Sequence, residues 1–188
     1  MEKSIICPLT EEKVKNLKVG DSVLISGTIY TARDAAHKRL IKLIEEGKEL
    51  PIDIKDSIIY YAGPTPAKPG NVIGSVGPTT SYRMDSFTPM LLDRGLRGMI
   101  GKGLRSKEVI ESIKKNRGIY FAAIGGVAAI IGKCIKKVEI VAYEDLDSEA
   151  IRKLEVKDLP VIVAIDSEGN NLYELGQKNY LNLSIYEV

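Results

Sequence analysis

Apolar and polar positions along this chain alternate with a period that switches between that of a strand and that of a helix. Residues 22–30 are rich in β-branched side chains and predict a strand, which Gly27 interrupts with a bulge. In residues 34–46 the apolar positions recur at the spacing of one helix face, and Gly47 supplies a stop. This part of the chain therefore predicts a strand followed by an amphipathic helix.

The same two patterns continue through the rest of the sequence. Short apolar runs between turns predict strands at 57–62, 71–76, 97–100, 120–124, 138–142, 161–165 and 171–174. Helical spacing predicts helices at 82–94, 107–115 and 127–134, and Ser106 is placed to cap the second of them. Strands and helices alternate along the chain. Such a pattern, with the strands in a sheet and the helices flanking it, indicates the α/β class. The last two strands predict an antiparallel hairpin, which makes the sheet mixed.

Length and composition favour one domain and narrow the class of partner. The 188 residues suffice for one substantial core, so we expect a single domain over residues 1–188, with the part after about residue 176 a peripheral extension. The 27 basic and 25 acidic residues are spread along the chain, so we expect neither nucleic acid nor a membrane as partner. Without a long apolar run or a secretory signal, we expect a cytoplasmic protein.

Thiol and imidazole ligands are scarce. The chain has two cysteines, Cys7 and Cys134, far apart in sequence, and one histidine, His37. Buried, reduced thiols are the first interpretation of the cysteines, and a reactive or paired thiol is the second. Because a [4Fe–4S] cluster needs three or four thiolates, we expect no metal or cluster to be held by this chain alone.

Three cations follow predicted strands or open helices, where α/β proteins often build sites: Arg33, Arg83 and Lys102. Guanidinium forks bind carboxylates in a bidentate manner, and helix starts attract negative charge, so these residues together suit a small dianion. Each also has a structural interpretation. Arg33 pairs with Asp34 or Asp21, Arg83 pairs with Asp85, or Lys102 is simply solvated.

A threonine pair and the histidine stand next to these cations. Thr79 and Thr80 are suitable caps for the following helix, and one of their two hydroxyls, close to positive charge, is a candidate catalytic group. His37 lies one turn after Arg33 and borders the apolar stripe of its helix. It is interpreted either as a packed, hydrogen-bonded histidine or as a second catalytic or orienting residue.

Five short motifs in order carry a family resemblance: Tyr30 to Arg39, Tyr61 to Thr65, Gly77 to Asp85, Ile100 to Gly103 and Ala123 to Gly126. Together with residues 149–156 and 166–170, they resemble the iron–sulfur-dependent hydro-lyases, specifically the C-terminal domain of class I fumarate hydratases. In two-subunit members this domain is a separate beta subunit. The resemblance covers nearly the whole chain.

This resemblance implies a swivelling β/β/α domain that packs on an alpha subunit carrying a [4Fe–4S] cluster. It also implies that Arg33, Arg83 and Lys102 bind the carboxylates of a dicarboxylate substrate, and that Thr79 lies at the reacting carbons as a proposed base. The cluster ligands and the general acid would then belong to the partner. The expected activity is reversible hydration of fumarate to L-malate, a reaction of the tricarboxylic acid cycle, with this chain inactive alone.

Two other functions stay open at this point. The beta subunit of L(+)-tartrate dehydratase shares the motifs, and its substrate differs by one hydroxyl. A stand-alone module that binds small anions through the same three cations is the alternative from another class. The sequence also leaves open self-association or a higher heteromer.

Overall fold

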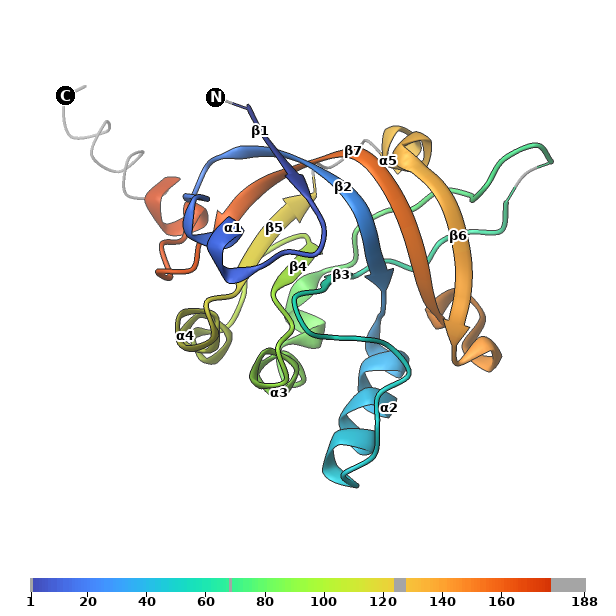
Figure 1. Ribbon diagram of the computed structural model, residues 1–188, viewed down its shortest axis with the longest axis horizontal. Helices are drawn as coiled ribbons and strands as arrows, with labels where there is room; N and C mark the ends of the chain where they lie inside the picture. The colour runs from blue at the N-terminus through green and yellow to red at the C-terminus, as the bar shows by residue number, and fades with distance from the viewer. Residues whose placement is uncertain (1, 68, 124–127, 177–188) are drawn as a thin grey trace, which may run out of the picture.

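The computed structural model describes residues 2–67, 69–123 and 128–176, drawn in Figure 1. Within these ranges the strands are β1 (Glu2–Ile6), β2 (Ser22–Thr31), β3 (Ile58–Tyr60), β4 (Gly98–Gly101), β5 (Ile119–Ala123), β6 (Ile135–Ala142) and β7 (Ile151–Ile165). The helices are α1 (Glu11–Lys15), α2 (Asp34–Glu45), α3 (Thr88–Asp93), α4 (Lys107–Asn116) and α5 (Ala128–Cys134), with 3-10 turns η1 (Ser81–Met84) and η2 (Glu144–Glu149). Residues 172–176 are also helical.

The strands form one mixed sheet in the order β1-β2-β3-β4-β5-β7-β6. Strands β1 to β5 pair in parallel, whereas β7 runs antiparallel to β2, β5 and β6. Because β2 pairs with β7 as well as with β3, the sheet curls back on itself, and α2, α3 and α4 lie together on one side of it (Figure 1). The predicted α/β class with a mixed sheet and flanking helices is confirmed.

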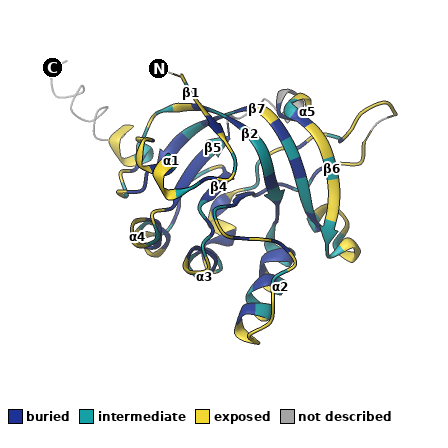
Figure 2. Cartoon of the chain, viewed as in Figure 1, coloured by how far each residue is buried: buried dark blue, intermediate teal, exposed yellow. Residues whose placement is uncertain are grey.

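The core has two parts, one on each face of the sheet. Side chains of β3 show the division: Ile58 and Tyr60 belong to one cluster, while Ile59 and the following Tyr61 belong to the other. This is the period of two that a pleated strand imposes. The second cluster also contains Leu40 and the apolar faces of α3 and α4. Figure 2 shows the buried positions concentrated on the strands and on the inner faces of these helices.

Several predicted elements are confirmed with small shifts of their ends. The strand predicted at 22–30 is β2, and its pairing with β7 shifts register between Ile25 and Gly27, as a bulge requires. The helix predicted at 34–46 is α2, which ends one residue earlier, before the left-handed Gly47 (φ +67). Ser106 caps α4 as predicted, because its Oγ accepts a hydrogen bond of 3.3 Å from the Val109 N–H.

The single helix predicted at 82–94 is wrong. The chain forms η1, a turn, and then α3, which begins at Thr88 with Pro89 in its first turn. Proline lacks the N–H that an internal helical position must donate, and its ring clashes with the preceding turn. A helix can therefore begin at Pro89 but cannot run through it.

The strand predicted at 71–76 is also wrong. This segment folds back on an earlier part of its own loop, where Thr65 N–H donates to the Ser75 carbonyl (3.0 Å) and Ser75 N–H donates to Thr65 Oγ1 (2.8 Å). These bonds satisfy the backbone locally. The segment therefore needs no partner in the sheet.

The closing hairpin differs from the prediction as well. Asn171 forms one bridge to Ile165, and its Oδ1 then accepts the Tyr173 N–H (3.1 Å), so that the chain turns into the helical residues 172–176 instead of a strand. The antiparallel strand that makes the sheet mixed is β7, which pairs with β2, β5 and β6 and is much longer than the predicted 161–165. The extension expected after about residue 176 lies outside the described residues, as do parts of the predicted elements at 120–124 and 127–134.

Candidate active site

The parallel strands bring the predicted site residues to one edge of the sheet. Strands β2, β3 and β4 are neighbours and run in the same direction, so their carboxyl ends meet there. Arg33 follows β2, Gly63 follows β3 and Lys102 follows β4. Ligands of open α/β sheets bind at this end of the strands. The Gly125–Gly126 turn after β5 lies outside the described residues.

Thr79 and Lys102 lie on adjacent backbone segments. Thr79 N–H donates to the Tyr61 carbonyl (2.6 Å), and Lys102 N–H donates to the Thr79 carbonyl (3.3 Å). A third bond runs from Ser81 N–H to the Lys102 carbonyl (2.9 Å). Two of the predicted residues therefore stand side by side. Thr80 precedes η1, but its side chain makes no capping hydrogen bond, so the predicted capping role is wrong for Thr80.

Arg33 and Arg83 share one carboxylate. Arg83 Nε donates to Asp34 Oδ1 (2.9 Å), and Arg33 Nε lies 3.9 Å from Asp34 Oδ2. Arg33 Nη2 also lies 3.6 Å from Glu149 Oε1, while Arg83 does not form the predicted alternative pair with Asp85. The two guanidinium groups, far apart in sequence, are thereby brought together around the first residue of α2.

The local charge balance leaves positive charge for a ligand. Lys102 is exposed and forms no ion pair with any residue in the described ranges. One of the two carboxylates is partly used elsewhere, because Glu149 Oε2 accepts the Ala35 N–H (2.8 Å) at the start of α2. Arg33 Nε and Asp34 Oδ2 are buried without a hydrogen-bond partner in the described part of the chain. Buried polar atoms of this kind indicate unmet hydrogen-bonding capacity.

Gly63 fixes how closely the chain approaches Arg33. A Cβ atom at this position would lie 2.9 Å from Arg33 Nη1 and 3.0 Å from the Ser148 carbonyl. Any larger residue after β3 would therefore displace the guanidinium. The glycine in the motif Tyr61 to Thr65 thus has a steric reason.

His37 is fully buried behind Arg33. Its Nδ1 lies 2.8 Å from the Arg33 carbonyl, and its ring contacts Tyr61 (5.4 Å between centroids) and Phe87 (6.0 Å). Burial is the main cause that lowers the pKa of His37 to about 4, and the nearby Arg105 charge adds to it. The geometry matches the packed, hydrogen-bonded interpretation, and an orienting role of the ring stays a prediction. A direct catalytic role of His37 stays a prediction.

Part of the candidate site faces the surface, because Lys102 is exposed and the Arg83 side chain is half-exposed. Two grooves of about 480 and 540 Å³ run along loop residues 64–75 beside the start and middle of β6, and neither is lined by Arg33, Thr79, Arg83 or Lys102. An enzyme needs to exclude water from reacting charges. The arrangement therefore suits a site that a second surface completes.

The cysteines do not fit a [4Fe–4S] cluster. Both thiols are free and pack against the core cluster that contains Ile58 and Tyr60. Burial raises the pKa of Cys7 to about 11 and also raises the pKa of Cys134. Two thiols are also too few for a [4Fe–4S] cluster, which needs three or four thiolates. Within the described ranges no three His, Cys, Asp or Glu side chains gather as metal ligands. None of the helices described there is long and apolar enough to cross a membrane.

Sequence reasoning missed the groups that organise this site. Asp34 and Glu149 hold the arginines, and a buried pair of Asp85 and Arg105 holds the segment that carries Thr79. Asp34 had been expected only as a partner of Arg33, and Asp85 only as a partner of Arg83. Ion pairs that join distant segments leave no periodic signal in a sequence.

Comparison with known proteins gives the family. The model of the family described as Fumarase C-terminus matches residues 3–176. The class I anaerobic fumarate hydratase of Escherichia coli is 44% identical over 158 residues, which are 83% of this chain and 29% of that protein. Fumarate hydratase 2 of Leishmania major is 40% identical over 164 residues, or 86% of this chain and 29% of that protein.

A third relative has nearly the same length. The Methanocaldococcus jannaschii protein named "Putative L(+)-tartrate dehydratase subunit beta" is 40% identical over 185 residues, which are 95% of this chain and 92% of that protein. The chain therefore spans under a third of the two fumarate hydratases but almost all of this subunit. With a family model that matches residues 3–176, this chain belongs to the Fumarase C-terminus family.

Proposed function

We propose that this chain is the beta subunit of a cytoplasmic two-subunit hydro-lyase, and that its reaction is the reversible hydration of fumarate to L-malate. The observations that carry the proposal are the Arg33 and Arg83 side chains held at Asp34, and the Lys102 backbone bonded to that of Thr79, at one edge of the sheet. The names of the relatives, which are fumarate hydratases and a subunit of a dehydratase, supply the reaction class.

The cations answer the main difficulty of the reaction. Removing a proton from the carbon next to a carboxylate builds up negative charge, so the transition state needs positive charge close to both carboxylates. Asp34 occupies the Nε side of Arg83, and no described residue takes a hydrogen bond from its terminal nitrogens. Arg83 can therefore present two parallel donors to a carboxylate, while Lys102 and Arg33 serve the remaining oxygens.

Thr79 is the proposed base for the proton at C3 of malate. An isolated hydroxyl is a poor base near neutral pH, because its alkoxide is strongly disfavoured without nearby positive charge. Lys102 lies on the adjacent backbone and Arg83 is four residues further along the same segment. In this proposal the two cations stabilise the Thr79 alkoxide.

A [4Fe–4S] cluster does not fit the described residues of this chain, so we assign it to the alpha partner. When bound there, it would act as a Lewis acid on the substrate hydroxyl. The present chain would then bind the dicarboxylate, exclude water when the two subunits close by a swivel of this domain, and hold the proton acceptor. Alone, it would be inactive.

L(+)-tartrate is the second candidate substrate, because the Methanocaldococcus jannaschii relative named for it is matched over 92% of its length. Anaerobic reconstitution with a cluster-bearing alpha partner, followed by assays on fumarate, malate and tartrate, separates the two. We expect turnover of fumarate and malate. Turnover of tartrate without turnover of malate would show that tartrate, and not fumarate, is the substrate.

A stand-alone anion-binding module is distinguished by calorimetry on the isolated chain. Because the alpha subunit would supply the rest of the site, we expect weak or no heat of binding with fumarate, malate or tartrate. Tight binding to the isolated chain would favour the module over the subunit.

A further inference from the structure

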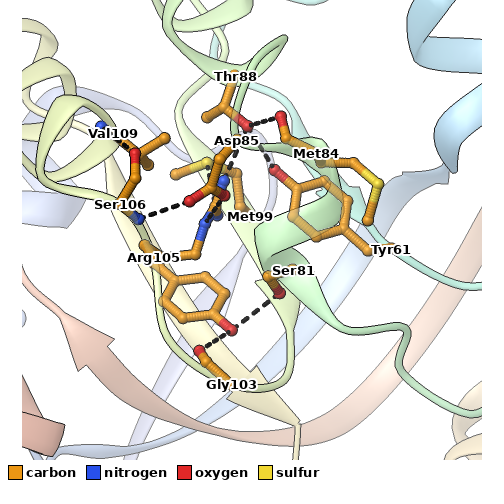
Figure 3. A network of polar contacts seen from close by, with 11 residues as sticks. Tyr61, Ser81, Met84, Asp85, Thr88, Met99, Gly103, Arg105, Ser106 and Val109 are labelled. Atoms are coloured by element: carbon orange, nitrogen blue, oxygen red, sulfur yellow. Dashed lines mark hydrogen bonds and ion pairs between the residues drawn. The ribbon is translucent and has the colours of Figure 1, made fainter.

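A buried polar network connects the segments that follow Thr79 and Lys102 in the chain, and Figure 3 shows its side chains. At its centre the Arg105 side chain is fully buried, and its Nε donates to Asp85 Oδ1 (2.7 Å). Its Nη2 donates to Thr88 Oγ1 (2.8 Å), and its guanidinium carbon lies 5.4 Å from the centroid of the Tyr61 ring and 5.0 Å from that of Tyr120. Every side of this cation is therefore occupied by protein.

The hydrogen bonds of the network fix the direction of each donor. Thr88 Oγ1 accepts a hydrogen bond from Arg105 and donates its own proton to the Met84 carbonyl (2.9 Å). Tyr61 OH therefore donates to Thr88 Oγ1 (3.3 Å). Asp85 uses its second oxygen to accept the Ser106 N–H. A network with each donor and acceptor matched in this way has one arrangement of low energy.

This network joins the two segments that carry the site. Asp85 and Thr88 belong to the segment that follows Thr79 and Arg83, whereas Arg105 and Ser106 follow Lys102. Figure 3 shows the side chains of the two segments meeting at Asp85 and Arg105. The segments are otherwise connected through the backbone bonds of Thr79 and Ser81 with Lys102.

A second, neutral contact connects the same segments. Ser81 Oγ lies 2.9 Å from Tyr120 OH, which donates to the Gly103 carbonyl (2.9 Å). Gly101 leaves the room for this contact, since a Cβ atom there would lie 1.9 Å from Ser81 Oγ. The register between the Thr79 segment and the Lys102 turn is thus fixed from two sides.

Stability alone is a weak reason for a buried ion pair. The cost of removing both charges from water often offsets their attraction, and apolar replacements of whole pairs are frequently neutral for stability. We infer that Arg105 and Asp85 are positioning residues, which hold Thr79 and Lys102 at the separation that a dicarboxylate requires. This inference rests on the proposed function. It explains why the side chain is an arginine, because a lysine cannot donate to Asp85 and Thr88 in one plane.

The test separates position from stability with a neutral double variant. Arg105→Met with Asp85→Asn leaves no unpaired charge, and the asparagine keeps an acceptor for the Ser106 N–H. In the reconstituted complex we expect kcat to fall by about tenfold or more, since a misplacement of ~1 Å can cost about 100-fold. Arg105→Lys, which keeps the charge and loses the planar fork, is expected to show a loss of the same order. If the double variant does not fold, Thr88→Val removes one acceptor of the guanidinium at nearly constant volume.

The matched control is a second arginine–aspartate pair next to β4, which is partly buried. Arg97 precedes β4, and its Nη2 lies 3.0 Å from Asp56 Oδ1, at the end of the strand opposite to the site. Arg97→Met with Asp56→Asn is expected to change kcat and KM by less than about twofold at a temperature where the fold is intact. Wild-type kcat and KM in the Arg105 and Asp85 double variant would overturn the inference and leave the proposed function standing.

Hydrogen exchange on the full chain without its partner gives a readout that does not depend on activity. Positioning predicts faster exchange of the Thr79 and Lys102 amides in the Arg105 and Asp85 variant than in the control variant of equal global stability. Equal exchange in both variants would contradict the inference. A wild-type complex without turnover on any of the three substrates would instead contradict the proposed function, and the exchange measurement would still decide on the positioning role.

Discussion

The buried His37 makes the stability of the fold depend on pH in a way that one substitution removes. Its Nδ1 faces the Arg33 carbonyl, which can only accept, so the proton of the neutral ring sits on Nδ1. Nε2 is buried without a partner in the described part of the chain. Burial chiefly lowers the pKa of His37 from 6.5 to about 4; the Arg33 carbonyl and Asp34 raise the pKa, and Arg105 lowers it.

The sign follows from which state takes up the proton first. Well above pH 6.5 the ring is neutral in both the folded and the unfolded chain, so His37 does not make the free energy of unfolding depend on pH there. As the pH falls from 6.5 toward 4, only the unfolded chain binds the proton, and stability is lost. The slope is about 1.4 kcal/mol per pH unit, which amounts to about 2 kcal/mol between pH ~7 and pH ~5.

Urea denaturation of the isolated chain at these two pH values measures the loss, with His37→Gln as the non-titrating comparison. This is the only histidine in the sequence, so no second imidazole contributes. Carboxylates such as Asp21, whose pKa the Lys3 ammonium lowers, titrate mainly below this range. A free energy of unfolding that falls equally in the wild type and in His37→Gln would refute the reasoning.

Three further predictions concern single side chains. Arg83→Ala is expected to abolish turnover of the reconstituted complex, yet to change the free energy of unfolding by less than about 1 kcal/mol, because its pair with Asp34 is half-exposed; equal losses of activity and stability would support a structural role. Ser106→Ala is expected to cost about 1 kcal/mol in urea denaturation through loss of the α4 cap, and no change would contradict the capping bond. Gly101→Ala is expected to cost about 1–3 kcal/mol because the new methyl overlaps Ser81 Oγ, and Ser81→Ala in the same chain is expected to recover part of it; no recovery would mean that the strain lies elsewhere.

Local periodicity predicted the elements that bury one face in a regular pattern. β2 and α2 each have one regular buried face, and both were found within a residue or two. β7 was found only in its last third, because Asp158 in a left-handed conformation (φ 51) and the following Pro160 interrupt its pattern. The strand continues through them since it is held by partners on both sides, and this information is absent from the local sequence.

The candidate site divides in the same manner. Arg33, Arg83 and Lys102 were predicted as site residues from their places at strand ends and helix starts, and the fold brings the strand ends together. Asp34 was expected as a partner of Arg33, but its bond to Arg83 and the contact of Glu149 with Arg33 were not predicted. The bond between Arg83 and Asp34 spans 49 residues and that between Arg105 and Asp85 spans 20, and such pairings are set by tertiary packing.

The central claim is that this chain supplies the cationic half of a site completed by another subunit. The most direct measurement is an anaerobic fumarate hydration assay with three samples: this chain, a cluster-bearing alpha partner, and the two together. We expect malate only in the third sample, and loss of that activity with Arg83→Ala. Malate formation by the partner alone at the rate of the mixture, or by this chain alone, would contradict it.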